Sequence, residues 1–307
     1  FMMQYENFTF QEAMQSLADR AGIELPKQEM SAAQREAADR RSRLLEINKV
    51  AAKYFYMLLR SPQGSHALQY FEERKLSKGT MQHFGLGYSN KYSDDLYQYL
   101  KKQGYEDELL KDSGLVTIDE RRGGHDKFWN RAMFPIMDAN NRVIGFGGRV
   151  MGEGEPKYLN SQESDVFQKK NNLYGLNLTR KDVSREDAII LVEGYMDVVS
   201  LYQAGVRNVS ASLGTALTEN QARLIKRYTK NVILSYDADQ AGQNAAFRGL
   251  DILYREGCRA RVLKVTDGKD PDEFIKKNGR NAFLELADHA IPYGDFKLNM
   301  VKQRYDT

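Results

Sequence analysis

The sequence predicts an α/β unit within a chain that is α+β overall. Two aliphatic runs, at 188–192 and 231–235, are typical of buried strands, and a third candidate strand covers 259–265. Helical patterns at 196–203, 218–228 and 243–255 lie between and after these runs. Alternation of strand and helix in this rhythm predicts a mostly parallel sheet flanked by helices.

The preceding region reads as mixed α+β. Helices are expected at 9–21, where Thr9 and Glu12 fit a capping box, and at 31–60, where Ser31 is a candidate N-cap. Segments 134–138 and 143–146, joined by a turn at 139–141, predict a β-hairpin. Helical patterns return at 282–289 and 296–304. We therefore expect three regions: a basic α+β subdomain at 1–183, the sheet-and-helix domain at 184–279, and the start of a helical subdomain at 280–307.

Acidic residues follow two of the predicted strands directly. Glu193 comes directly after the first run, and Asp237 and Asp239 follow the second. In parallel sheets, ligands bind outside the carboxyl ends of the strands, so these three carboxylates are expected to meet there. Clustered carboxylates repel unless a cation lies between them, and hard oxygen ligands favour Mg2+ or Mn2+. The alternative is ordinary turn chemistry, in which Asp239 only caps the next helix.

Two further acidic positions are open to both interpretations. Asp270 and Asp272 flank a proline, a pattern that is also typical of a helix N-cap followed by Pro in the first turn. Asp197 lies four residues after Glu193, where it could support the site or simply favour the positive end of a helix dipole.

Composition fits an intracellular enzyme without a disulfide framework. Cys258 is the only cysteine in 307 residues, which makes a zinc site improbable, and the four histidines have no ligand-like spacing. We find no apolar run long enough to span a bilayer and no secretory leader, so the cytoplasm is the expected location.

Charge is informative through its distribution. The net charge is only +3, but residues 121–181 hold eleven Lys or Arg against six Asp or Glu, with aromatic residues between them. Basic residues neutralise phosphates and aromatic rings stack on unpaired bases, so this segment is a candidate nucleic-acid surface. The alternative is a solvated β-surface whose aromatics face a core.

The acidic motifs resemble those of a known family. Glu193-Gly194, Asp237-Ala-Asp239 and Asp270-Pro-Asp272 are similar to the Toprim domain of bacterial primases, topoisomerases and some nucleases. The blocks at 193–197, 212–215, 134–136, 143–149 and 156–161 resemble DnaG-type bacterial primases in particular. The resemblance covers most of the chain and implies the RNA polymerase (catalytic core) domain of such a primase, without its zinc ribbon.

The resemblance also implies roles for individual residues. It makes Glu193, Asp237 and Asp239 the catalytic metal ligands, with Asp270 and Asp272 supporting a second or third Mg2+ or Mn2+ ion. Glu193 could alternatively act as an acid or base. Residues implied in nucleotide or template binding are Arg74, Arg131, Arg149, Lys157, Tyr158, Asn160, Lys169, Gly194 and Asp197.

The implied reaction is the synthesis of short RNA primers on a single-stranded DNA template from ribonucleoside triphosphates, by two-metal nucleotidyl transfer. The family also implies a replicative helicase as partner, through a C-terminal domain that this chain does not show. Two alternatives remain: a Toprim topoisomerase or nuclease that cleaves strands, and a noncatalytic module that binds single-stranded DNA. The upstream basic blocks favour the primase, because topoisomerases are not expected to carry them.

Overall fold

The structure is a computed structural model that describes residues 10–24, 31–119, 121, 123–214, 216–236, 240–265 and 267–305. The chain divides into two compact units, Phe1–Arg43 and Leu44–Thr307. The first unit contains α2 (Phe10–Ala21) and the start of α3 (Ala32–Leu59). The predicted cap of α3 is confirmed, since Ser31 Oγ accepts the Gln34 N–H at 3.2 Å and Gln34 Oε1 accepts the Ser31 N–H at 2.9 Å. Thr9 lies outside the described residues.

An antiparallel sheet organises the amino-terminal half of the second unit. Its strand order is β1 (Gly87–Ser89), β4 (Arg131–Met137), β5 (Val143–Val150) and β6 (Tyr158–Asn160). The predicted hairpin is confirmed as β4–β5, with Asn141 at φ 60° in its turn. The remaining elements of this half are α4 (Ser65–Glu73), α5 (Lys78–His83), α6 (Asp95–Lys102), α7 (Asp107–Asp112), the hairpin β2 (Val116–Asp119) and β3 (Gly123–Asp126), and the 3-10 turns η1 (Pro62–Gly64) and η2 (Lys169–Asn171).

A mostly parallel sheet organises the carboxy-terminal half, as predicted. The order is β11 (Ile291–Pro292), β10 (Arg259–Val262), β9 (Asn231–Leu234), β7 (Ile189–Val192) and β8 (Val209–Ala211), with only β11 antiparallel to its neighbour. The helices are α8 (Leu176–Glu186), α9 (Tyr195–Gln203), α10 (Glu219–Lys226), α11 (Gln240–Arg255), α12 (Pro271–Asp288) and α13 (Tyr293–Tyr305). All three predicted strands are present.

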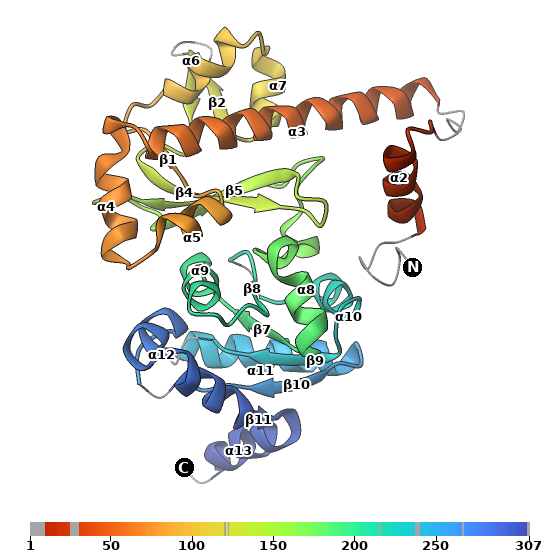
Figure 1. Cartoon of the computed structure of the whole chain (residues 1–307), viewed down its shortest axis with the longest axis vertical. Coiled ribbons are helices and arrows are strands. Elements are labelled where there is room, and N and C mark those ends of the chain that lie inside the picture. The colour runs from red at the N-terminus through yellow and green to blue at the C-terminus, as the bar shows by residue number, and fades with distance from the viewer. Residues whose placement is uncertain are drawn as a thin grey trace. The chain divides into compact units, whose positions relative to one another are not determined.

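Helices cover both faces of this sheet because alternate residues of its strands point to opposite sides. In β7, Ile190 and Val192 pack in one cluster with residues of α9 and α12. Ile189 and Leu191 pack in a second cluster with residues of α8, α10 and α11. The result is a three-layer α/β/α arrangement, in which α9 and α11 lie on opposite sides of the sheet (Figure 1). This arrangement explains why the strands read as continuous apolar runs.

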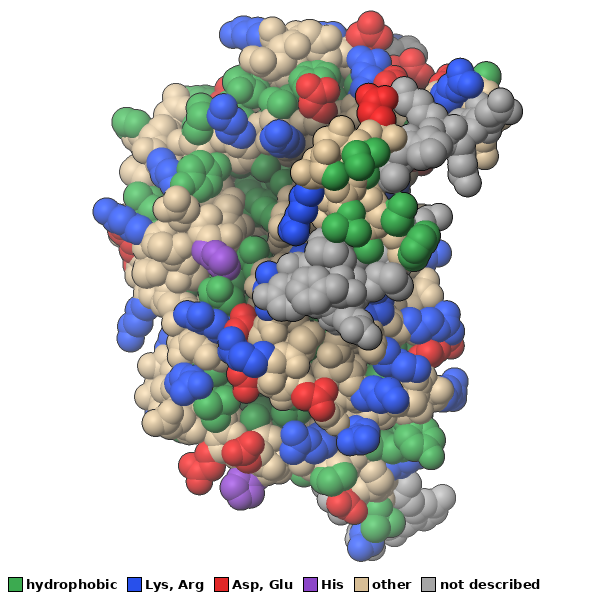
Figure 2. Space-filling view, turned by 45° about the vertical axis from the view of Figure 1, so that its right-hand side comes forward, with side chains coloured by type: hydrophobic (Ala, Val, Ile, Leu, Met, Phe, Trp, Pro, Cys, Tyr) green, Lys and Arg blue, Asp and Glu red, His purple; other side chains and the backbone are tan. Residues whose placement is uncertain are grey.

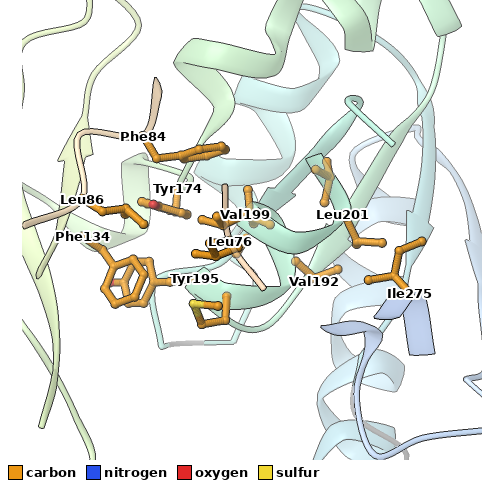
Figure 3. Close-up of a cluster of buried hydrophobic side chains, with 14 of the residues drawn as sticks. Leu76, Phe84, Leu86, Phe134, Tyr174, Val192, Tyr195, Val199, Leu201 and Ile275 are labelled. Atoms are coloured by element: carbon orange, nitrogen blue, oxygen red, sulfur yellow. The ribbon is translucent and has the colours of Figure 1, made fainter. Parts of the chain in front are cut away.

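The two sheets share one core through α9. Tyr195, the first residue of α9, is buried and stacks on Phe134 of β4 with ring centroids 5.2 Å apart. Its ring also meets Tyr174 edge-on at 4.6 Å. Figure 3 shows these rings together with aliphatic side chains from both halves of the unit, including Leu86 and Val192. The antiparallel sheet is therefore packed directly against the helix that follows β7.

The expected division at 183/184 and 279/280 stays a prediction. The first position falls within α8, and the second coincides with a non-helical break in α12, where Gly279 has φ 80°. In the part of the chain that the structure describes, no helix combines the length and apolar character needed to cross a membrane.

Candidate metal and nucleotide site

Glu193 lies at the switch point of the parallel sheet. It follows β7 directly, and β7 pairs in parallel with β8 on one side and with β9 on the other. The chain leaves β7 into α9 on one face and leaves β9 into α11 on the other, which is the arrangement at which α/β sheets bind ligands. Glu193 is half-buried, and its charge, after burial itself, helps to raise the pKa of the buried Tyr236 phenol at the end of β9.

The other two predicted catalytic acids, Asp237 and Asp239, lie outside the described residues. They follow Tyr236, and β9 and β7 end side by side, since the Ser235 N–H donates to Leu191 O at 2.8 Å. Glu193 and the two aspartates that follow β9 in sequence offer only oxygen donors, which fits Mg2+ or Mn2+. Among the residues described, no group of three acidic, His or Cys side chains forms a cluster that could hold a metal.

Asp197 holds the turn that carries Glu193. It is buried in the first turn of α9, and its Oδ2 accepts the Gly194 N–H at 3.0 Å, so it acts within the helix cap. Its Oδ1 accepts the Asp272 N–H at 3.1 Å. A side chain at Gly194 would meet this carboxylate, because an added Cβ would lie 2.7 Å from Asp197 Oδ2. Asp197 thus lies in the first turn of α9, as its helix-dipole interpretation requires, and it also caps the helix and contacts α12, which the sequence did not predict.

Asp270 and Asp272 differ in their surroundings. Asp270 is the N-cap of α12, with Oδ1 accepting the Glu273 N–H at 2.8 Å, which is the alternative that the Asp-Pro pattern left open. Asp272 is only 2 % exposed and forms ion pairs with Arg74 at 2.9 Å and with Lys276 at 2.6 Å. The metal-ligand role expected for both residues stays a prediction.

Arg74 and Arg149 lie on the ring of Tyr70. The guanidinium carbon of Arg149 is 4.5 Å from the ring centroid and that of Arg74 is 5.7 Å away. Burial raises the pKa of the Tyr70 phenol, while both arginines oppose that rise. Arg149 Nη1 donates to Val150 O at 3.1 Å, and its buried Nε has no hydrogen-bond partner among the described residues. Two of the predicted basic residues are therefore brought together by α4 and β5, with an aromatic ring between them.

The other predicted basic residues take different places. Arg131 is buried, and its Nη1 donates to Gly148 O at 3.1 Å and Pro156 O at 2.9 Å, so it joins β5 to the segment before β6. Burial lowers the pKa of its guanidinium. Lys157 is exposed and has no ion-pair partner within the described ranges. Lys169 lies in η2, where its backbone is held by Glu163 and Gln221.

Tyr158 and Asn160 lie on β6. Tyr158 is 39 % exposed, with its ring 6.3 Å from that of Tyr195. Asn160 is used within the protein, since its Oδ1 accepts the Tyr195 hydroxyl at 2.5 Å and its Nδ2 donates to Leu213 O at 3.0 Å. Contact with a nucleotide by either residue stays a prediction.

Three neighbours of these residues were missed from the sequence: Tyr70, Ser200 and Lys276. Lys276 could have been found, because it lies four residues after Asp272 on one helix face. Tyr70 could have been found in the same way, because Arg74 lies four residues after it. Ser200 carries no such signal, since its partner Asp272 lies 72 residues away in sequence. On the face shown in Figure 2, Lys and Arg side chains are mixed with Asp and Glu, in keeping with the small net charge.

Comparison with known proteins first defines the class. A Toprim-like family model matches residues 190–275, which contain most of β7, the strands β8, β9 and β10, and the turn at Glu193. The chain therefore contains a Toprim-like domain. A second family model, the N-terminal domain of the DNA primase catalytic core, matches residues 54–180, which include the antiparallel sheet.

The particular family follows from individual relatives. The solved E. coli primase catalytic core is 38% identical with a TM-score of 0.79, covering 85% of this chain and 84% of that one. A solved DnaG primase catalytic domain described as bound to single-stranded DNA is 37% identical with a TM-score of 0.80, covering 87% and 84%. The chain belongs to the DnaG primase family and corresponds to its catalytic core.

A DNA primase of Clostridium acetobutylicum is 45% identical over 97% of this chain. The chain spans about half the length of such curated relatives, 49% in this case.

Proposed function

We propose that this chain synthesises short RNA primers on single-stranded DNA from ribonucleoside triphosphates, in bacterial DNA replication. One observation carries the proposal: the turn that bears Glu193 and the cluster of Arg74, Arg149 and Tyr70 belong to one continuous set of contacts through Asp197 and Asp272. Nucleotidyl transfer needs metal ligands beside cations that offset a triphosphate, and this arrangement supplies both kinds of group.

Glu193, Asp237 and Asp239 are the residues that would hold two Mg2+ or Mn2+ ions. Asp270 would contribute to a further ion through Oδ2, since its Oδ1 caps α12. When bound, such ions lower the pKa of an attacking 3'-hydroxyl and stabilise the leaving pyrophosphate. Arg149 and Lys157 would bind phosphate, and Arg149 suits this role because its Nε lacks a partner among the described residues. Single-stranded DNA as template is supported by the relative described as bound to it.

The direct test is incorporation of labelled ribonucleotides on a single-stranded template. Glu193→Gln and Asp237→Asn should each lower incorporation by about a hundredfold or more, because each removes a charged ligand. Glu219→Gln is the control, since this residue is exposed and its ion pair in the described part of the chain is with Arg223 on its own helix. Arg149→Met should weaken nucleotide or template binding while metal binding survives.

The alternative, a Toprim topoisomerase or nuclease, predicts a different product. The same preparations should therefore be incubated with supercoiled DNA. Nicking or relaxation without any RNA synthesis by the wild-type chain would overturn the proposal. Contact with a replicative helicase is proposed only for proteins with the full length of the curated relatives, about half of which this chain spans.

A further inference from the structure

Asp272 is a buried carboxylate near the site, and both of its oxygens accept hydrogen bonds. Asp272 is 2 % exposed, and three side chains from three helical segments contact its carboxylate. Oδ2 accepts Nη1 of Arg74 at 2.9 Å and Nζ of Lys276 at 2.7 Å. Oδ1 accepts the Ser200 hydroxyl and lies 2.6 Å from Lys276 Nζ.

These contacts leave Asp272 no room for a metal ion. A carboxylate offers about four lone-pair positions, and two donors already approach each oxygen of Asp272. A divalent cation at either oxygen would also lie within a few ångströms of the Lys276 ammonium and the Arg74 guanidinium. Like charges repel strongly at such separations in a buried place. Asp270 differs, because among the described residues it accepts a side-chain hydrogen bond at Oδ1 alone, from the Glu273 N–H.

The position of Asp272 suits a supporting role. Its N–H donates to Asp197 Oδ1 at 3.1 Å, and Asp197 Oδ2 accepts the N–H of Gly194 at 3.0 Å. Gly194 follows Glu193 directly, so the start of α12 is joined to the turn that carries the proposed ligand. Arg74 extends the same set of contacts to α4, 198 residues away in sequence.

We infer that Asp272 is a positioning residue for Glu193 and not a metal ligand, although the Asp270-Pro-Asp272 motif predicts a ligand at this position. The inference rests on the proposed metal site at Glu193. Its carboxylate neutralises Arg74 and Lys276 and fixes the first turn of α12. That turn holds Asp197, and Asp197 holds the backbone at Gly194. Asp272 therefore acts on the reaction through the orientation of Glu193.

The test compares Asp272→Asn with Asp270→Asn in the full 307-residue chain. Mn2+ binding is measured by electron paramagnetic resonance without nucleotide, and primer synthesis is measured as a function of Mn2+ concentration. For Asp272→Asn we expect a dissociation constant for Mn2+ within about twofold of wild type and a turnover about tenfold lower at saturating Mn2+. Adding Lys276→Met should restore part of the turnover, because it removes a cation left without a partner.

Two outcomes would overturn the inference. One is a rise of about tenfold or more in the Mn2+ dissociation constant of Asp272→Asn at unchanged thermal stability. The other is full recovery of its turnover at high Mn2+, which marks a weakened ligand. The Mn2+ measurement needs no primer synthesis, so failure of the proposed reaction would be visible separately, as RNA absent from the wild-type reaction.

Lys276→Met alone provides a second test of the inference if Asp272→Asn does not fold, because this variant keeps the Asp272 carboxylate. We expect unchanged Mn2+ affinity, within about twofold, and a turnover lower by about threefold or more. If Asp272 were a ligand, loss of the competing ammonium would strengthen Mn2+ binding. A gain of about fivefold or more would therefore refute the positioning role.

Discussion

Replacing Gly147 by alanine tests the packing that joins the two sheets. An added Cβ at this position of β5 would lie 2.4 Å from Tyr195 Cζ and 2.6 Å from its hydroxyl oxygen. The ring cannot easily withdraw, because it stacks on Phe134, meets Tyr174 edge-on and donates to Asn160. The substitution therefore forces either β5 or α9 to move.

The magnitude follows from the cost of overpacking a core, which is about 1–3 kcal/mol. Contacts below 3.0 Å with a ring fixed on three sides place Gly147→Ala at the upper end, about 3 kcal/mol. At about 2 °C per kcal/mol for a domain of this size, the melting temperature should fall by about 6 °C. Primer synthesis should fall by more than the loss of stability explains. Tyr195 lies two residues after Glu193, so a shift of α9 also shifts the proposed metal ligand.

The assay is thermal unfolding followed by circular dichroism, with primer synthesis measured at 25 °C. Gly79→Ala in α5 is the matched control, because its added Cβ would have no neighbour closer than 3.9 Å, and it should melt at or above the wild-type temperature. In a Tyr195→Leu background the cost of Gly147→Ala should shrink, since the smaller side chain leaves space. Melting of Gly147→Ala within about 1 °C of wild type would refute the proposed contact.

Three further predictions follow from buried or capping groups. Burial raises the pKa of Asp126 from 3.8 to about 6, so the stability supplied by its protonated form is full below about pH 4 and is lost as pH rises through 6. The difference in unfolding free energy between wild type and Asp126→Asn should fall by up to about 3 kcal/mol from pH 4 to pH 7 in urea titrations, and a constant difference would contradict this. Gln221→Ala should cost about 2–3 kcal/mol, because its buried amide donates to two backbone carbonyls, while Asn220→Ala beside it should cost less than about 1 kcal/mol. Ser31→Ala should lower the stability of the start of α3 by about 1 kcal/mol, seen as faster amide exchange at Gln34; unchanged exchange would reject the cap.

The sequence predicted those elements that have a clear period or an uninterrupted apolar run. Strands β7 and β9 are buried on both faces, so their patterns were continuous and their ends were read to within a residue. Strands β8 and β11 have three and two residues, which is too short for any period to appear. Their pairing is decided by neighbours along the sheet and not by their own composition.

Of the predicted acids that the structure describes, Glu193 follows a strand and Asp270 begins a helix, as the sequence indicated, but the surroundings of these acids could not be predicted. Asp270 and Asp272 look equivalent in sequence, yet one caps a helix and the other lies between two cations. The difference arises from Arg74, which comes from another part of the chain. Carboxylates at turn positions can be recognised locally, whereas the cations that face them depend on tertiary packing.

The segment from Glu193 to Asp197 combines the proposed metal ligand with the residues that support it. Glu193 lies at the switch point, Tyr195 packs on Gly147 of the antiparallel sheet, and Asp197 binds both its own turn and α12. Each of these contacts reaches a different neighbouring element, so the backbone at Gly194 is fixed from several directions. A metal ligand needs such support, because its orientation decides the geometry of the bound ion. The five-residue motif therefore combines the proposed ligand with contacts that join it to the antiparallel sheet and to α12.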